Sequence, residues 1–281
     1  MTRPPLDARS QLGRAGLRPK KSWGQNFLAE GSVHAAIVDA LGATPNETVV
    51  ELGAGLGALT YFLLERGARV IAVERDRELI PLLSENLAAF DRCEVLEADA
   101  AKLDYEGLKA RVGRPLVVVG NLPYQLSSRI LVSIAAAADS VQRVVVLVQR
   151  EVAERLAATP GGRTRGLLSV LVQRRFDAQL IKVVAPGAFY PRPQVHSAVV
   201  RLVRHARTVS PQEDQAVVEV ARAAFSSRRK SLRNAMSLRF GREKTDRWLE
   251  RTGIDPRRRA ETLELDEWSA LARACLDGGE F

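Results

Sequence analysis

Short apolar runs rich in β-branched residues alternate with helical patterns between residues 48 and 204. Examples of these runs are RVIAVE at 69–74, PLVVVG at 115–120 and QRVVVLVQ at 142–149. Segments with apolar residues at helical spacing, such as RELIPLLSENLAAF at 77–90, separate them. Strands that alternate with helices predict a mostly parallel sheet with helices on both faces.

Two further runs, DAQLIKVVA at 177–185 and HSAVVRLVR at 196–204, have no helical pattern between them and predict an antiparallel edge of the sheet. The strand signals stop after HARTVSPQ at 205–212, and amphipathic helical patterns follow. Ser210 and Pro211 are typical of an N-cap and a first helical residue. We therefore predict three parts, which are a basic N-terminal tail over 1–20, an α/β domain over 21–206 and a small all-α domain over 207–281.

The composition is that of an ordinary globular protein. Of 281 residues, 46% are hydrophobic and 27% are charged, so the chain can bury a core without metal or disulfide bonds. No stretch approaches the ~18 apolar residues of a membrane span. The first 22 residues carry six basic residues and one acid, without the apolar segment of a secretory signal. We expect a cytoplasmic protein with no membrane partner, and an organellar transit peptide stays open as the alternative.

The cysteines and histidines give no sign of a metal site. Cys93 and Cys275 lie far apart, and neither belongs to a C-x-x-C pair. The three histidines, His34, His196 and His205, have no neighbour at metal-ligand spacing. We therefore predict neither a disulfide framework nor a catalytic metal.

The charge of the chain favours a polyanionic partner. A net charge of +9 suits nucleic acid or an acidic membrane surface. Within the predicted helical domain, the segment 222–233 contains no acid. Its basic residues are Arg222, Arg228, Arg229, Lys230 and Arg233. A cluster of this kind on one surface is suited to phosphate contact, and a solvated helix face is the alternative.

A glycine-rich segment, VVELGAGLGALT at 49–60, lies between a predicted strand and a predicted helix. Glycines there permit a tight turn and let a ligand approach the backbone, and Glu74, at the end of the next strand, can accept hydrogen bonds from ribose hydroxyls. The spacing of Gly53, Gly55 and Gly57 is G-x-G-x-G, which differs from the dinucleotide fingerprint. With Glu51 in front, the segment resembles the first motif of methyltransferases.

Two more strand ends carry polar chemistry. Asp99 follows the third predicted strand, where it is suited either to an adenine amine or to a helix N-cap. NLPY at Asn121–Tyr124 follows the fourth strand. The Asn121 side-chain oxygen and the Leu122 carbonyl can accept the two hydrogens of a conjugated amine and aim its lone pair at a methyl donor, without a strong base. If the amine belongs to a nucleic-acid base, Tyr124 can stack on that base, which contributes about 1–3 kcal/mol. The alternative interpretation of NLPY is an ordinary turn.

Five motifs occur in order along the chain, namely KSWGQNFL at 21–28, ELGAGLG at 51–57, NLPY at 121–124, FYPRPQVHS at 189–197 and FSSRRKSLRN at 225–234. Together they resemble the rRNA adenine N6-dimethyltransferases, and within that family the small-subunit (16S) enzymes. The resemblance implies an α/β, Rossmann-like, seven-stranded S-adenosylmethionine methyltransferase sheet with a small all-α C-terminal domain. It implies N6-dimethylation of two adjacent adenines in the 3′-terminal hairpin loop of 16S rRNA, on an immature small ribosomal subunit. We expect a monomer.

The resemblance also implies roles for individual residues. Cofactor binding falls to Asn26, Leu28, Gly53, Gly55, Glu74, Asp99 and Asn121. Catalysis falls to Asn121, Leu122, Pro123, Tyr124 and Phe189. Phe189 would join Tyr124 around a flipped adenine, and core packing is the alternative for it. RNA binding falls to Arg228, Arg229, Lys230 and Arg233. Trp23 stands where the family more often has Leu or Phe, which we expect to alter packing only.

Three other functions fit parts of the pattern. A methyltransferase that modifies one adenine of large-subunit RNA shares the fold and the NLPY chemistry, but the longer C-terminal part favours the small-subunit enzyme. A protein glutamine methyltransferase typically has N-P-P-Y and needs no basic helical domain. A non-catalytic RNA-binding factor on this scaffold would not need Glu74, Asp99 and Asn121. A dehydrogenase is disfavoured because nothing resembles a hydride-transfer site.

Overall fold

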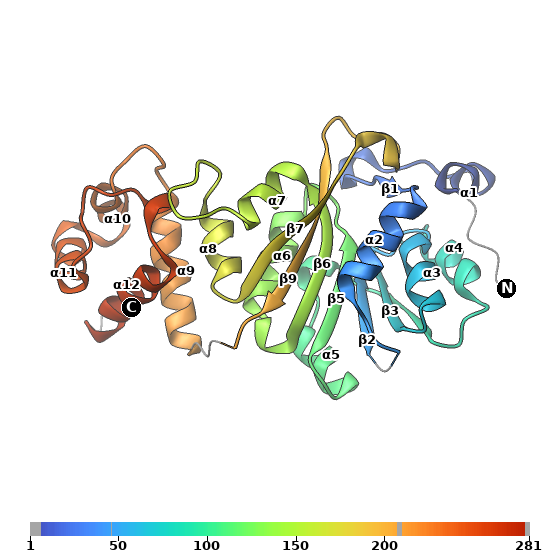
Figure 1. Ribbon diagram of the computed structural model, residues 1–281, viewed down its shortest axis with the longest axis horizontal. Coiled ribbons are helices and arrows are strands. Elements are labelled where there is room, and N and C mark those ends of the chain that lie inside the picture. Colours follow the sequence, from blue (N-terminus) through green and yellow to red (C-terminus); the bar gives the residue numbers. More distant parts are fainter. Residues whose placement is uncertain (1–6, 46, 207–209, 279–281) are drawn as a thin grey trace. The chain divides into compact units, whose positions relative to one another are not determined.

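The structure of the protein, a computed structural model, describes residues 7–45, 47–206 and 210–278 (Figure 1). The chain forms two compact units. The first consists of the residues up to Ala153 together with Phe176–Arg204, and the second of Glu154–Arg175 together with the residues from His205 onward. Arg3 of the predicted basic tail and residues 207–209 of the predicted linker lie outside the described residues.

A seven-stranded sheet forms the centre of the first unit, in the order β4-β3-β2-β5-β6-β9-β7. Its strands are β2 Thr48–Leu52, β3 Arg69–Glu74, β4 Cys93–Glu97, β5 Leu116–Asn121, β6 Val141–Gln149, β7 Phe176–Val184 and β9 Ser197–Arg204. Neighbouring strands from β4 to β6 are parallel, whereas β9 is antiparallel to both β6 and β7. The predicted mostly parallel sheet and its antiparallel edge are confirmed.

A second, two-stranded sheet pairs β1 (Phe27–Leu28) with β8 (Phe189–Tyr190). In this antiparallel pair, Phe27 lies opposite Tyr190 and Leu28 lies opposite Phe189. The pair brings the segments KSWGQNFL and FYPRPQVHS together across more than half of the chain. The sequence did not predict it, because two-residue strands are too short to show an alternating pattern.

The helices lie before, between and after the strands in the chain. They are α1 Ala8–Arg14, α2 Gly31–Leu41, α3 Ala58–Glu65, α4 Ile80–Leu87, α5 Tyr105–Val112, α6 Ser127–Ala136, α7 Arg150–Leu156, α8 Leu167–Gln173, α9 Pro211–Phe225, α10 Leu232–Phe240, α11 Arg242–Thr252 and α12 Leu265–Asp277. Short 3₁₀ turns occur at Lys21–Trp23, Ala100–Lys102, Ala138–Ser140, Pro186–Ala188 and Ala260–Thr262. Among the described residues, no helix is long and apolar enough to cross a membrane.

Both faces of the central sheet are covered. Apolar residues of α2, α3 and α4 share one core cluster with Val117 and Val119 of β5. Val118 points to the opposite face, because side chains alternate along a strand, and it is also fully buried. Helix α5 contacts β5, which it precedes in the chain. The burial of successive valines explains why this strand reads as a continuous apolar run.

The direction of winding reverses beside β2. This strand has β3 on one side and β5 on the other. The chain therefore adds β3 and β4 on one side of β2, and then returns to add β5 and β6 on the other side. In sheets of this kind, the loops at the carboxyl ends of the strands on either side of the reversal enclose a crevice. The glycine-rich segment follows β2 and NLPY follows β5, so both lie at this position.

The second unit is an all-α structure with its own core. The core contains buried residues of four C-terminal helices and of α8, including Val217, Leu232, Trp248, Trp268 and Val170. Helix α9 begins as predicted, with Ser210 as N-cap accepting a hydrogen bond from the Glu213 N–H and Pro211 as the first residue.

Residues 154–175 belong to the second unit, although the predicted α/β domain included them. The reason is the packing of α8 and of Arg165. Arg165 is fully buried and donates hydrogen bonds to the carbonyls of Ala158 and Leu263 at 2.9 and 3.3 Å. The contact with Leu263 is remote in sequence, so the pattern of apolar residues does not reveal it.

Candidate active site

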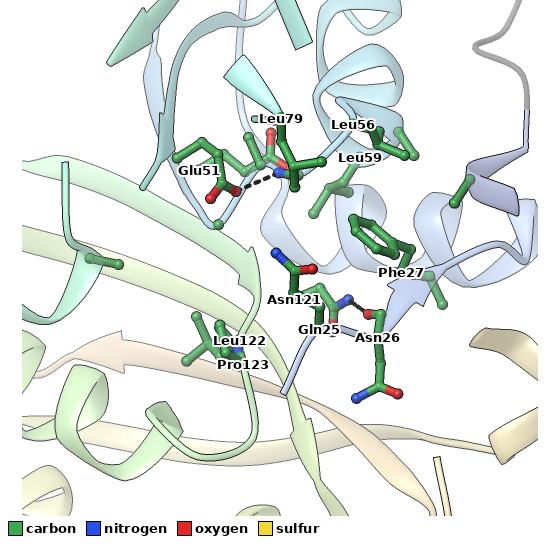
Figure 2. Close-up of a pocket in the computed structure, with 18 of the residues that line it drawn as sticks. Gln25, Asn26, Phe27, Glu51, Leu56, Leu59, Leu79, Asn121, Leu122 and Pro123 are labelled. Carbon is green, nitrogen blue, oxygen red and sulfur yellow. Dashed lines mark hydrogen bonds between the residues drawn. The ribbon is translucent and has the colours of Figure 1, made fainter. Parts of the chain in front are cut away.

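A cavity of about 310 Å³ lies in the first unit at the carboxyl ends of the parallel strands (Figure 2). Ten of the eleven residues predicted for catalysis or cofactor binding line it, namely Asn26, Leu28, Gly53, Gly55, Glu74, Asp99, Asn121, Leu122, Pro123 and Tyr124. Among the described residues, no group of three or more His, Cys, Asp or Glu side chains is placed to hold a metal ion. The cavity is lined by backbone, amide, carboxyl and apolar groups together with Arg75 and His34.

The glycine-rich segment forms one wall of the cavity. Gly55 has a φ of +59°, and a Cβ atom on this residue would lie 3.2 Å from the ring of Phe27. Its N–H donates a 2.9 Å hydrogen bond to Glu74 at the end of β3. A larger residue at Gly55 would be strained and would crowd the cavity, so glycine is required here for both conformation and space.

Glu74 is buried and already holds three backbone N–H groups. Besides Gly55, the N–H groups of Arg75 and Asp76 each donate to it at 2.8 Å. Burial raises the pKa of Glu74, although these hydrogen bonds favour the charged form and oppose the shift. A carboxylate offers about four acceptor positions, so one position is left for a ribose hydroxyl.

Asp99 has two roles in the structure. One carboxylate oxygen accepts a 2.9 Å hydrogen bond from the Ala101 N–H and caps the short 3₁₀ turn that follows. The other oxygen lies 3.9 Å from a guanidinium nitrogen of Arg75. The helix-cap interpretation of Asp99 is confirmed, and its position on the cavity wall keeps it within reach of a ligand.

Trp23 does more than pack. The Arg75 guanidinium carbon lies 4.0 Å from the centre of a Trp23 ring, and the Lys20 ammonium lies 4.8 Å from it. A cation over the face of an indole is attracted by the negative face of the ring. The expectation that Trp23 alters packing only is therefore wrong, and Arg75, a cavity-lining residue, was missed by the sequence.

The Asn121 amide has a fixed orientation. Its Nδ2 donates a 2.8 Å hydrogen bond to the main-chain carbonyl of Asn26, as drawn in Figure 2. Because the nitrogen is used in this way, the side-chain oxygen is the end of the amide that can accept a hydrogen bond from a ligand. The Leu122 N–H donates to the Leu147 carbonyl of β6 at 3.0 Å and fixes the start of the NLPY turn.

The Tyr124 ring is held by its hydroxyl. This hydroxyl lies 2.7 Å from Ser197 Oγ, at the start of β9. Burial raises the pKa of Tyr124, and the Ser197 contact opposes the shift. The last residue of FYPRPQVHS therefore supports the last residue of NLPY, which links two of the five motifs.

Phe189 is placed differently from the other predicted residues. It is 5% exposed and packs in the main core with Leu28 and Val199. It does not line the cavity, and the β1–β8 pairing explains its burial. The core-packing alternative describes this placement, and contact of Phe189 with a flipped adenine stays a prediction.

The N-terminal helix α1 also forms part of the cavity wall. Asp7, Ala8 and Gln11 line it, and Leu12 is 2% exposed in a small cluster with Leu56 and Leu79. The predicted basic tail thus contains a helix packed on the first unit. No signal of the short segment ARSQLGR distinguishes it from a tail, because only one strongly apolar residue is present.

The four predicted RNA-binding residues lie in the second unit with unequal surroundings. Arg228 donates to the carbonyls of Arg163 and Arg165 at 2.9 and 3.3 Å. Arg233 forms a two-point ion pair with Asp246. Arg229 and Lys230 lie exposed in the turn between α9 and α10. These two side chains are therefore the most available for phosphate contact.

Comparison with known proteins adds independent evidence. The model of the ribosomal RNA adenine dimethylase family matches residues 16–275. The chain is 48% identical over 276 residues to the ribosomal RNA small subunit methyltransferase A of Anaeromyxobacter dehalogenans, with 95% of this chain and 96% of the relative covered. It is 44% identical over 271 residues to the protein of the same name from Myxococcus xanthus, with 95% and 94% covered. A crystal structure of a dimethyladenosine transferase from Plasmodium falciparum has the same fold, with a TM-score of 0.73, 22% identity and coverage of 90% of this chain and 98% of that one.

Proposed function

We propose that this chain, which belongs to the ribosomal RNA adenine dimethylase family and is an rRNA adenine methyltransferase, uses S-adenosylmethionine to dimethylate two adjacent adenines in the 3′-terminal hairpin loop of 16S rRNA. It acts as a monomer on an immature small ribosomal subunit. The orientation of the Asn121 amide carries this proposal, because it presents an acceptor at the reversal point of the sheet.

The cavity suits the proposed methyl donor. Its volume of about 310 Å³ falls in the range of small-molecule sites. Glu74 has an acceptor position left for the ribose, Asp99 lies one strand further along for the adenine amine, and the backbone at Gly53 and Gly55 lets the donor approach closely. When bound, S-adenosylmethionine supplies an electrophilic methyl group on a sulfonium.

The protein's part in the reaction is to orient the target nitrogen. The lone pair of adenine N6 is delocalised into the ring and is a weak nucleophile. Hydrogen bonds from N6 to the Asn121 oxygen and the Leu122 carbonyl draw the nitrogen towards tetrahedral geometry. With the donor held in the cavity, the lone pair would be aimed at its methyl group, and the proton that N6 gives up would pass to solvent. Positioning and fixed dipoles lower the barrier, so no strong base is needed.

Tyr124 is suited to holding the target base. Its hydroxyl is fixed by Ser197, and the residue lines the same cavity as Asn121. Stacking on an unpaired base contributes about 1–3 kcal/mol. Arg229 and Lys230 of the second unit would bind phosphates of the RNA and supply affinity without reading its sequence.

The direct test is methyl transfer from labelled S-adenosylmethionine to under-methylated small subunits, followed by digestion of the RNA to nucleosides. We expect label in N6,N6-dimethyladenosine from the 3′-terminal hairpin. Label in large-subunit RNA, or in a peptide glutamine, would contradict the proposed substrate. Asn121→Ala protein that binds the donor but transfers no label is the matched control.

A further inference from the structure

The segment Lys20–Asn26, here called the strap, crosses from the end of β3 to the end of β5. At its first end, Lys20 Nζ lies 2.6 Å from one carboxylate oxygen of Asp76, and Gln25 Nε2 donates to the other at 2.8 Å. Gln25 Oε1 also accepts a 2.7 Å hydrogen bond from the Lys20 N–H. Asp76 is 2% exposed. The buried Asp76 carboxylate therefore contacts both ends of the turn in the strap, and Lys20 Nζ also lies 2.5 Å from a carboxylate oxygen of Glu78.

The other end of the strap lies against the NLPY turn. The Asn26 carbonyl accepts the hydrogen bond from the Asn121 amide. Gly24 has a φ of +66°, and a Cβ atom there would lie 3.4 Å from the Tyr124 backbone nitrogen. The strap thus touches two residues proposed to hold the target adenine, and its position decides where the Asn26 carbonyl lies.

We propose that Asp76 and Lys20 are positioning residues for methyl transfer, which hold the strap so that the Asn26 carbonyl keeps the Asn121 amide in its reactive orientation. This inference rests on the proposed function of Asn121. Within the described part of the chain, neither Asp76 nor Lys20 lines the cavity. Neither side chain can therefore contact the donor directly, and the effect of both passes through the strap, whose residues 23–26 line the cavity.

The chemistry of the anchor suits this role. Burial raises the pKa of Asp76, but hydrogen bonds from Lys20 and Gln25 outweigh this effect and lower it overall, so the carboxylate is charged at neutral pH. Hydrogen bonds between charged groups are short and about twice as strong as neutral ones. Without the ion pair the strap can shift, and the Asn121 amide loses the acceptor that decides which of its ends faces the target. An amide turned end for end would present N–H groups to the amine and could not accept its hydrogens.

The test compares Lys20→Met and Asp76→Asn with the wild type and with Arg77→Gln. Arg77 lies on the same turn after β3, and its side chain is 84% exposed in an ion pair with Glu97. Arg77→Gln therefore removes a nearby charge pair without touching the strap. The measurements are the single-turnover rate on under-methylated small subunits, the binding of S-adenosylhomocysteine by calorimetry, and the melting temperature.

We expect each anchor variant to lower the single-turnover rate roughly tenfold or more, because small displacements of reacting groups cost rate steeply. The Kd of S-adenosylhomocysteine should rise by a smaller factor than the rate falls, because strap residues line the cavity but Glu74 and Asp99 keep their positions. The double variant should be no slower than Lys20→Met, since that single variant already loses the pairs of Lys20 with Asp76 and with Glu78. Lys20→Arg should restore most of the rate, and Arg77→Gln should leave it unchanged.

An unchanged rate in Lys20→Met, or a loss of donor binding as large as the loss of rate, would overturn the inference. Should Asp76→Asn fail to fold, Lys20→Met decides, because the Lys20 side chain is 31% exposed and its loss leaves the core intact. Failure of the wild type to label 16S RNA would instead reject the proposed function itself. The two failures are thus distinguishable within one experiment.

Discussion

The Thr60 hydroxyl lies 2.5 Å from a carboxyl oxygen of Glu51, and both side chains are buried. Burial raises the pKa of Glu51 to about 8, the Thr60 hydrogen bond opposes this shift, and the charge of Glu74 adds to it. Glu51 is therefore a neutral acid at neutral pH. Glu51, which precedes the first glycine of the segment, lines the cavity as an uncharged hydrogen-bonding group, while Glu74 receives the backbone N–H groups.

Stability should fall as this acid ionises. The folded-state pKa is higher than the value of about 4.5 expected in the unfolded chain, so the folded state binds more protons between these values. The contribution of Glu51 to stability is therefore fully present below about pH 4.5 and is lost as pH rises towards about 8. Glu51→Gln removes the ionisation, and we expect the variant to gain relative to the wild type as pH rises.

Urea unfolding of both proteins at about pH 5.5 and about pH 8.5 measures this difference. The free energy of unfolding of Glu51→Gln minus that of the wild type should increase between the two conditions. A difference that is the same at both pH values would show that Glu51 does not titrate in this range.

Asn121→Ala should abolish methyl transfer and weaken donor binding only in part. The variant loses the acceptor proposed for the target amine, whereas Glu74 and Asp99 still line the cavity. We expect a loss in single-turnover rate of at least about a hundredfold, the usual effect of removing one preorganised dipole. Equal losses in rate and in donor affinity, measured by calorimetry, would instead indicate a purely structural role.

Two substitutions separate the contribution of the Tyr124 hydroxyl from that of its ring. Tyr124→Phe keeps the ring but leaves Ser197 without this partner, so we expect about 1 kcal/mol lower stability and near-normal transfer. Tyr124→Ala also removes the stacking surface and should weaken binding of the target adenine by about 1–3 kcal/mol. Apparent KM for RNA and urea unfolding report the two effects. Equal activity of the Ala and Phe variants would rule out stacking.

The basic residues of the second unit should not contribute equally to RNA binding. Arg229→Gln combined with Lys230→Gln should flatten the dependence of log Kd on log salt by roughly 0.7–0.9 for each phosphate that the protein no longer neutralises. Arg233→Gln should change this slope less, because Asp246 already pairs with Arg233. Filter binding over a range of salt concentrations measures the slopes. Identical slopes for the wild type and the Arg229/Lys230 variant would show that these two residues do not contact RNA phosphates.

The sequence predicted the strands that carry the site because their hydrophobic pattern can be recognised along the chain. Parallel strands buried on both faces are apolar runs, and ligand residues follow where those runs end. Glu74, Asp99 and Asn121 could therefore be found by their positions alone, and all three line one cavity. The family resemblance, drawn from short motifs, is confirmed by the comparisons.

What the sequence did not reveal depends on contacts between distant residues. Lys20 and Asp76 are 56 residues apart, and nothing in either segment marks them as partners. The ion pair of Arg233 with Asp246 likewise changes an apparently free basic residue into a structural one. Phe189 is buried because a two-residue strand pairs across the chain, a feature below the length at which patterns can be recognised.

Helix α1 places part of the cavity wall before residue 16, where the family match begins. A protein shortened to the matched range would keep all five motifs and lose Leu12, which packs on Leu56 of the glycine-rich segment. It would also lose Gln11, whose side chain accepts a hydrogen bond from Asn86, a residue that donates to the Leu56 carbonyl as well. The choice of where to truncate this protein is therefore also a choice about its ligand site, and an intact α1 belongs among the conditions of any binding assay.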